Sequence, residues 1–220
     1  MKINEIFKSI SGEAGKAGFP VIFIRTYGCN LRCGYCDSMY AVEGGEYKIM
    51  PPSGIVGECY NYGVKRVILT GGEPLIQPDA PELVDLLCDY GYEVEIETNG
   101  AVDLREFHNK LKTRRIDLLT YTMDFKSFSS GMSHKMNRTN LEFLGPKDCI
   151  KFVVGNKQDL DQMKAVLNSC EVHAQVFVSP VFGQIEPHQI VDYVLKNNMA
   201  DVRVQLQMHK IIWDKDKRGV

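Results

Sequence analysis

Short apolar runs rich in β-branched residues alternate with segments of helical spacing along the whole chain. Such runs predict strands, and apolar residues three or four positions apart predict helices. The strands are predicted at residues 21–27, 66–70, 93–98, 118–125, 149–154, 175–179 and 202–207, with a weaker entry strand at 3–7. Most of these runs lack strict polar–apolar alternation, as expected for strands that are covered on both faces.

Capping signals mark the helices predicted between these strands. The segment 79–91 begins with Asp79, carries a proline in its first turn and ends at Gly91, which is typical of a complete helix. Further helices are predicted at residues 103–111, 158–169 and 187–196, and a less regular one at 53–60. The polar segment 127–140 directly follows a strand, and we interpret it as a functional loop.

This repetition of strand and helix predicts an α/β fold with a parallel sheet, either open or curled into a full or partial barrel. Ligands in such folds bind at the carboxyl ends of the strands. No linker, composition shift or internal repeat divides the chain, so we expect a single domain over residues 1–220.

Composition and charge narrow the class of partner. The chain is 44% hydrophobic and 25% charged, with a formal net charge of −2. This charge balance favours a small molecule over nucleic acid as the partner. Its apolar runs are shorter than the roughly 20 residues that a membrane helix needs, and we find no signal peptide pattern at the N-terminus. Seven cysteines without an export signal indicate a reducing compartment, and we expect a cytoplasmic protein.

Three cysteines stand close together immediately after the strand at 21–27. Cys29, Cys33 and Cys36 form the pattern C-x3-C-x2-C. Structural zinc and ordinary iron–sulfur clusters take four ligands, so three thiolates leave one position open for chemistry. A distant histidine or another cysteine completing a zinc site is the alternative. The other cysteines lie in apolar segments and are interpreted as buried small side chains: Cys59, Cys88, Cys149 and Cys170.

A second motif, Gly71-Gly72-Glu73-Pro74, follows the next strand. Two glycines allow a ligand to approach the backbone, and the Glu73 carboxylate can bind an ammonium group. Alone, this pattern is an ordinary turn. The next two strands also end in polar groups, which core packing does not require.

The cysteine motif, with Tyr35 before its last cysteine, resembles the signature of radical S-adenosylmethionine (SAM) enzymes. The resemblance implies a [4Fe–4S] cluster on Cys29, Cys33 and Cys36, with one iron left for the amino and carboxylate groups of SAM. Reduction of the sulfonium would then release a 5′-deoxyadenosyl radical. The contacts it implies for the cluster and SAM region are Tyr35, Asp37, Gly71, Gly72, Glu73, Glu97, Asn99, Lys126, Ser127 and Phe128.

Within this superfamily, nearly the whole chain is similar to the 7-carboxy-7-deazaguanine synthase family of queuosine and 7-deazapurine biosynthesis. The similar segments are residues 9–13, 18–25, 28–33, 36–38, 124–131, 179–181 and 207–213. The resemblance implies that 6-carboxy-5,6,7,8-tetrahydropterin undergoes ring contraction with loss of ammonia, assisted by Mg²⁺.

The family's substrate contacts carry over to particular positions. Arg25 matches the contact to the substrate carboxylate, for which a planar guanidinium is suited, although a salt bridge at a strand end would also explain it. Ser38 matches a Mg²⁺ ligand, or else is a helix cap. The other matched substrate contacts are Ile10, Ser11, Gly12, Glu13, Thr70 and His209, the last in the final strand. Many family members have Gln in place of Ser11 and Pro in place of Phe128.

The resemblance also implies a low-potential electron donor, flavodoxin or ferredoxin, and a homodimer. Two alternatives stay open. A glycyl-radical-enzyme activase shares the cysteine motif but needs a protein-docking surface rather than a pterin pocket. The second alternative is a non-enzymatic iron–sulfur or zinc protein. The Gly-Gly-Glu-Pro motif argues against it, because such a protein would not need this motif.

Overall fold

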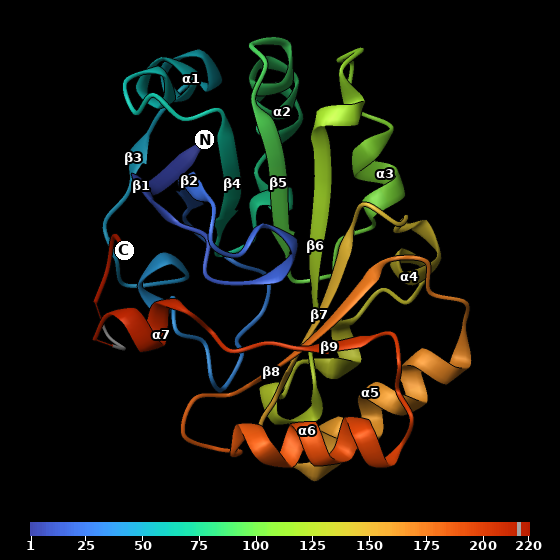
Figure 1. The fold of residues 1–220 in the computed structure, drawn as a ribbon. Coiled ribbons are helices and arrows are strands. Elements are labelled where there is room, and N and C mark those ends of the chain that lie inside the picture. The colour runs from blue at the N-terminus through green and yellow to red at the C-terminus, as the bar shows by residue number, and fades with distance from the viewer. Residues whose placement is uncertain (215–216) are drawn as a thin grey trace.

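The computed structural model describes residues 1–214 and 217–220 and contains a sheet of nine strands, shown in Figure 1. The strand order is β3-β1-β2-β4-β5-β6-β7-β8-β9, and every neighbouring pair from β2 to β9 is parallel. The strands are β1 (Lys2–Ile10), β2 (Pro20–Thr26), β3 (Lys48–Ile49), β4 (Arg66–Gly71), β5 (Glu93–Thr98), β6 (Leu119–Phe125), β7 (Cys149–Val154), β8 (Gln175–Pro180) and β9 (Val202–Val204). The predicted α/β class with a mainly parallel sheet is confirmed.

Helices fill the crossovers between the parallel strands. They are α1 (Pro52–Tyr60), α2 (Ala80–Asp89), α3 (Leu104–His108), α4 (Thr139–Phe143), α5 (Lys157–Ser169), α6 (Pro187–Lys196) and α7 (His209–Ile212). The predicted bounds of α1, α2, α5 and α6 are close to those observed. The helix predicted at α3 extends three residues beyond the observed end. The helices α4 and α7 were not predicted. No helix among the described residues is long and apolar enough to cross a membrane.

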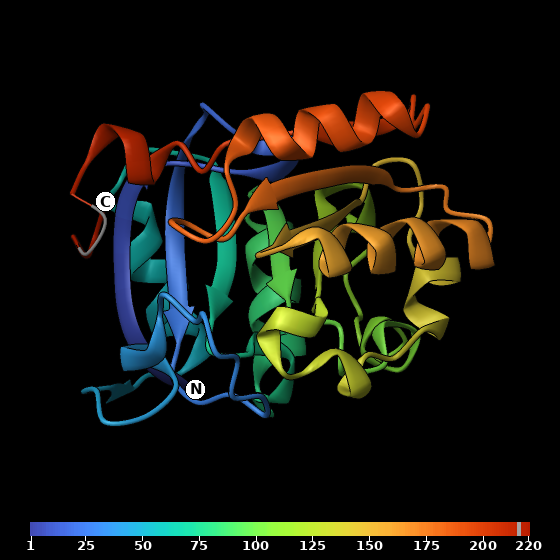
Figure 2. The ribbon, with the colours of Figure 1, turned by 90° about the horizontal axis from the view of Figure 1, so that it is seen from below.

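The C-terminal segment departs from its predicted structure. We expected a strand over residues 202–207, but β9 ends at Val204. The chain leaves the sheet because Gln205 accepts a hydrogen bond from the backbone of Ala14, and the Met208 N–H donates to the carbonyl of Gly12. The chain then forms α7 beside the N-terminal strands (Figures 1 and 2).

The two faces of the sheet differ in polarity. On β5, Val94 and Ile96 enter the core beneath the helices, whereas Glu95 and Glu97 point to the opposite face. The same alternation on β6 leaves a series of polar side chains on that face. One cavity is lined by side chains of β1, β2 and β4 to β7, so the polar face is concave. The sheet is therefore a partial barrel with a polar interior.

Asp79 does not cap α2 with its side chain, contrary to the prediction. Its carboxylate instead pairs with the buried N-terminal ammonium of Met1 at 3.0 Å. By contrast, the Asp103 carboxylate caps α3 by accepting from the backbone N–H of Glu106. Gly91 has the positive φ, +80°, expected of a residue that ends a helix.

Asp159 ties the start of α5 to the loop after β6. It is fully buried, and its two oxygens accept hydrogen bonds from the backbone N–H groups of Ser129, at 3.0 Å, and Gly155, at 2.7 Å. We expect Asp159→Ala to lower the free energy of unfolding by about 2–4 kcal/mol, because both donors lose their acceptor. Urea unfolding tests this, with Asp192→Ala on the exposed side of α6 as the matched control. An equal effect of the two substitutions would refute this role.

Candidate active site

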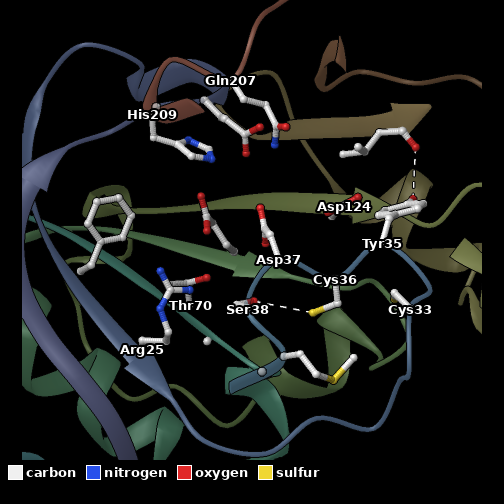
Figure 3. Close-up of a pocket in the computed structure, with 18 of the residues that line it drawn as sticks. Arg25, Cys33, Tyr35, Cys36, Asp37, Ser38, Thr70, Asp124, Gln207 and His209 are labelled. Carbon is white, nitrogen blue, oxygen red and sulfur yellow. Dashed lines mark hydrogen bonds between the residues drawn. The ribbon is translucent and has the colours of Figure 1, made fainter. Parts of the chain in front are cut away.

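A cavity of about 590 Å³ lies on the concave face, at the carboxyl ends of the parallel strands. Its walls come from the strand ends, from the loop that begins at Gly28, and from the C-terminal segment that begins at Gln207. Figure 3 shows side chains from these separate elements directed toward one another. Because ligands of parallel α/β folds bind at this edge, the cavity is the candidate active site.

The cysteine-bearing loop is fixed at several points. The Gly28 N–H donates to the carbonyl of Ala41 at 2.7 Å, and the Gly34 N–H donates to the carbonyl of Ser130 at 3.0 Å. The Tyr35 hydroxyl donates to the carbonyl of Val153 on β7, at 3.2 Å (Figure 3). The loop therefore holds its three cysteines, Cys29, Cys33 and Cys36, at the cavity wall.

The chemistry of these cysteines fits an iron–sulfur cluster. All three are unpaired and half-buried. In the described part of the chain, no three His, Cys, Asp or Glu side chains converge closely enough to hold a single metal ion. Burial raises the pKa of the Cys33 thiol to about 11, so a thiolate at Cys33 needs the positive charge of bound metal. Three thiolate donors spread along one wall suit a larger iron–sulfur group with an open position.

The Gly-Gly-Glu-Pro motif packs directly against the cysteine loop. The N–H of Gly72 donates to the carbonyl of Thr26, and the N–H of Glu73 donates to the carbonyl of Gly28. A Cβ atom at Gly72 would lie 2.1 Å from the Gly28 oxygen, and Gly71 has a φ of +133°. Gly71 and Gly72 line the cavity as predicted, but their missing side chains also permit this contact between the two motifs.

Glu73 holds a second residue in place rather than facing the cavity. It is fully buried, and its carboxylate accepts from Leu75 N–H, the Thr98 hydroxyl and Asn99 N–H at 2.7–3.0 Å. Burial raises the pKa of Glu73 to about 7 despite these hydrogen bonds. The Asn99 side chain then donates to Asn30 Oδ1 at 2.8 Å and to Cys29 Sγ at 3.5 Å. Sequence spacing could not reveal this last contact, which joins residues 70 positions apart.

Arg25 directs its guanidinium into the cavity beside Thr70 (Figure 3). Its Nε donates to Glu5 Oε1 at 2.8 Å, and the Tyr40 hydroxyl donates to the same oxygen at 2.9 Å. The salt-bridge interpretation of Arg25 is confirmed, and because the planar group still faces the cavity, its contact with a substrate carboxylate stays a prediction. Such a group can bind a carboxylate with two parallel hydrogen bonds.

Residues of the segment 10–14 form another wall of the cavity. A Cβ atom at Gly12 would lie 2.6 Å from His209 Nδ1, so the glycine permits a close approach by α7. Glu13 forms an ion pair with Lys151 of β7. His209 lines the cavity, but it lies at the start of α7 and not in the last strand as predicted.

Four predicted contact residues do not line the cavity: Ser11, Glu73, Ser127 and Phe128. Ser11 is buried in a turn, where its N–H and carbonyl bond to Phe19 and Gly18. Phe128 is 57% exposed and lies in the short 3-10 helix Phe128–Ser130. Contacts of these side chains with a ligand stay predictions.

The other predicted residues line the cavity: Ile10, Gly12, Glu13, Arg25, Cys29, Cys33, Tyr35, Cys36, Asp37, Ser38, Thr70, Gly71, Gly72, Glu97, Asn99, Lys126 and His209. Besides Arg25 and Glu13, two more of them belong to ion pairs, Asp37 with Lys210 at 3.1 Å and Lys126 with Asp124 at 2.9 Å. Burial raises the pKa of Glu97 to about 7. Sequence reasoning missed Lys151, although a lysine within the otherwise apolar run of β7 was a usable signal.

Comparisons with known proteins identify the family of this chain. The family model of the radical SAM superfamily matches residues 23–163. The 7-carboxy-7-deazaguanine synthase of Clostridium acetobutylicum is 43% identical over the whole chain and 99% of the relative. The enzyme of that name from Methanospirillum hungatei is 39% identical over 96% of this chain and 85% of the relative.

A solved structure supports the fold. The crystal structure of QueE from Escherichia coli has a TM-score of 0.74, covers 94% of each chain and is 23% identical. With full-length identity of 43% to a curated relative, the chain belongs to the radical SAM superfamily and, within it, to the 7-carboxy-7-deazaguanine synthase family.

Proposed function

We propose that this protein converts 6-carboxy-5,6,7,8-tetrahydropterin into 7-carboxy-7-deazaguanine, with loss of ammonia. The observation that carries the proposal is the shared cavity, in which three cysteines and the guanidinium of Arg25 line one space. The names of the relatives support the same reaction. The substrate is a small anion, and Arg25 supplies the matching charge.

The residues at one side of the cavity suit the cluster and SAM. Cys29, Cys33 and Cys36 would hold the cluster, and when bound it supplies, with SAM, a radical that abstracts a hydrogen atom from the substrate. Asn99 and the Gly71-Gly72 backbone line the cavity beside Cys29 and offer polar groups to SAM. Lys126, paired with Asp124, contributes positive charge on the same side.

The other side of the cavity suits the pterin. Arg25 binds the carboxylate, and the Thr70 hydroxyl lies beside it (Figure 3). The Glu13 carboxylate accepts hydrogen bonds from ring N–H groups. The walls from β1, β2 and α7 keep the substrate away from bulk water.

Mg²⁺ binding is part of the proposal. Ser38 lines the cavity and its Oγ lies 3.8 Å from Cys36 Sγ. Mg²⁺ usually keeps several waters and takes few protein ligands. We propose that Ser38 and the substrate carboxylate share the ion, with no carboxylate cage from the protein. A flavodoxin or ferredoxin as donor, a homodimer and a cytoplasmic location complete the proposal.

The proposal is tested by anaerobic reconstitution with iron and sulfide, followed by dithionite, SAM, Mg²⁺ and the pterin. We expect 7-carboxy-7-deazaguanine by mass spectrometry. Cys33→Ala should abolish cluster binding and product, whereas Cys170→Ala, a half-buried cysteine outside the cavity, should retain both. Formation of 5′-deoxyadenosine without deazapurine would reject the pterin and leave the glycyl-radical activase as the next hypothesis. Zinc in place of iron would reject radical chemistry.

Arg25→Lys should lower kcat/KM for the pterin by about tenfold or more, because an ammonium cannot reproduce two parallel hydrogen bonds to a carboxylate. Steady-state kinetics provide the measurement. Arg203→Lys, at an exposed arginine of β9, is the matched control. Unchanged kinetics in the Arg25 variant would remove this residue from the substrate contacts.

Asn99→Ala should lower the reduction potential of the cluster, because the Asn99 side-chain amide Nδ2–H donates to Cys29 Sγ and hydrogen bonds to cluster sulfurs favour the reduced state. A redox titration followed by electron paramagnetic resonance measures the potential. Asn198→Ala, an exposed residue after α6, is the control. An unchanged potential at full iron content would show that this contact does not tune the cluster.

A further inference from the structure

Glu13 is held at both its backbone and its carboxylate. On its N-terminal side, the Gly12 carbonyl accepts from Met208 N–H at 3.2 Å, and on its C-terminal side, the Ala14 N–H donates to Gln205 Oε1 at 2.6 Å. At the far end of the side chain, Oε2 accepts from Lys151 Nζ. These contacts leave Glu13 little freedom to turn.

One oxygen of this carboxylate has no partner. Glu13 Oε1 is buried and accepts no hydrogen bond from the described residues. A buried carboxylate oxygen without a donor is costly, so a ligand that offers an N–H group to this oxygen would stabilise the site. Since Glu13 lines the cavity, such a donor can come from a bound molecule.

Lys151 is the residue that selects this orientation. It lies on β7, is 8% exposed, and faces the carboxylates of Glu13, Glu97 and Asp124. Its Nζ donates to Glu13 Oε2, whereas Asp124 pairs with Lys126 at 2.9 Å. This contact occupies Oε2 and makes Oε1 the acceptor that remains.

We propose that Lys151 is a positioning residue, which holds Glu13 so that Oε1 accepts an N–H of the substrate heterocycle. The inference rests on the proposed function. It assigns to β7 a role in recognising the donor-rich edge of the ring, opposite the carboxylate bound by Arg25. Lys151 itself need not touch the substrate.

A double-mutant cycle on substrate affinity tests this role. Reconstituted enzyme is loaded with S-adenosylhomocysteine, which cannot be cleaved, and anaerobic calorimetry measures the Kd of 6-carboxy-5,6,7,8-tetrahydropterin. Lys151→Met and Glu13→Gln should each weaken binding by about tenfold. The double variant should be no weaker than the weaker single variant, and Lys151→Arg should restore part of the affinity. Lys157→Met, at an exposed lysine of α5, is the control.

Partial rescue by Lys151→Arg separates positioning from a purely structural role, because the guanidinium is also a cation that can donate to Glu13 Oε2.

Additive losses in the double variant, or wild-type affinity in Lys151→Met, would overturn the inference. If Lys151→Met does not fold, Lys151→Gln takes its place in the cycle. If the wild-type protein binds the pterin but forms no product, the proposed reaction is rejected, and the double-mutant cycle still tests Lys151. Absence of wild-type binding would reject both.

Discussion

Charge buried on the concave face of the sheet is the constraint on which this site depends. Carboxylates and ammonium groups removed from water require partners, and the structure supplies them as Glu5 with Arg25, Glu13 with Lys151 and Asp124 with Lys126. These pairs fix side chains that would otherwise be mobile. Two carboxylate oxygens, Glu13 Oε1 and Asp124 Oδ1, are buried without a hydrogen-bond partner among the described residues, and both residues line the cavity where a ligand can bind.

A second constraint joins the cysteine loop to the Gly-Gly-Glu-Pro motif. Gly72 can pack against the Gly28 carbonyl only because it lacks a side chain, and Glu73 orients Asn99 toward Cys29. The motif at the end of β4 therefore supports the cysteine loop. Asn99, directly after β5, contacts Cys29, the first cysteine of that loop. Damage to either motif is expected to disturb the other, since backbone hydrogen bonds connect them directly.

Local sequence signals predicted much of the fold. The bounds of β5, β7 and α6 agree with the prediction, because buried β-branched runs and a proline-started helix are encoded locally. The cysteine spacing likewise pointed to a loop that lines the cavity. The strand predicted through residue 207 failed, because contacts with Ala14 and Gly12 draw the chain out of the sheet.

Pairs distant in sequence account for what could not be predicted. Lys151 meets Glu13 across 138 positions, and Asn99 meets Cys29 across 70. Glu73 was expected to face a ligand, yet the folded chain supplies three donors to its carboxylate. Such partners follow from strand order and curvature, which no local pattern specifies.

The most direct test is an anaerobic crystal structure of the reconstituted protein with SAM and the pterin. The account predicts the substrate carboxylate on the Arg25 guanidinium and a ring N–H on Glu13 Oε1, with the Glu13–Lys151 pair intact. A pterin bound in the reverse direction, with its carboxylate at Lys151, or bound outside the cavity, would contradict it.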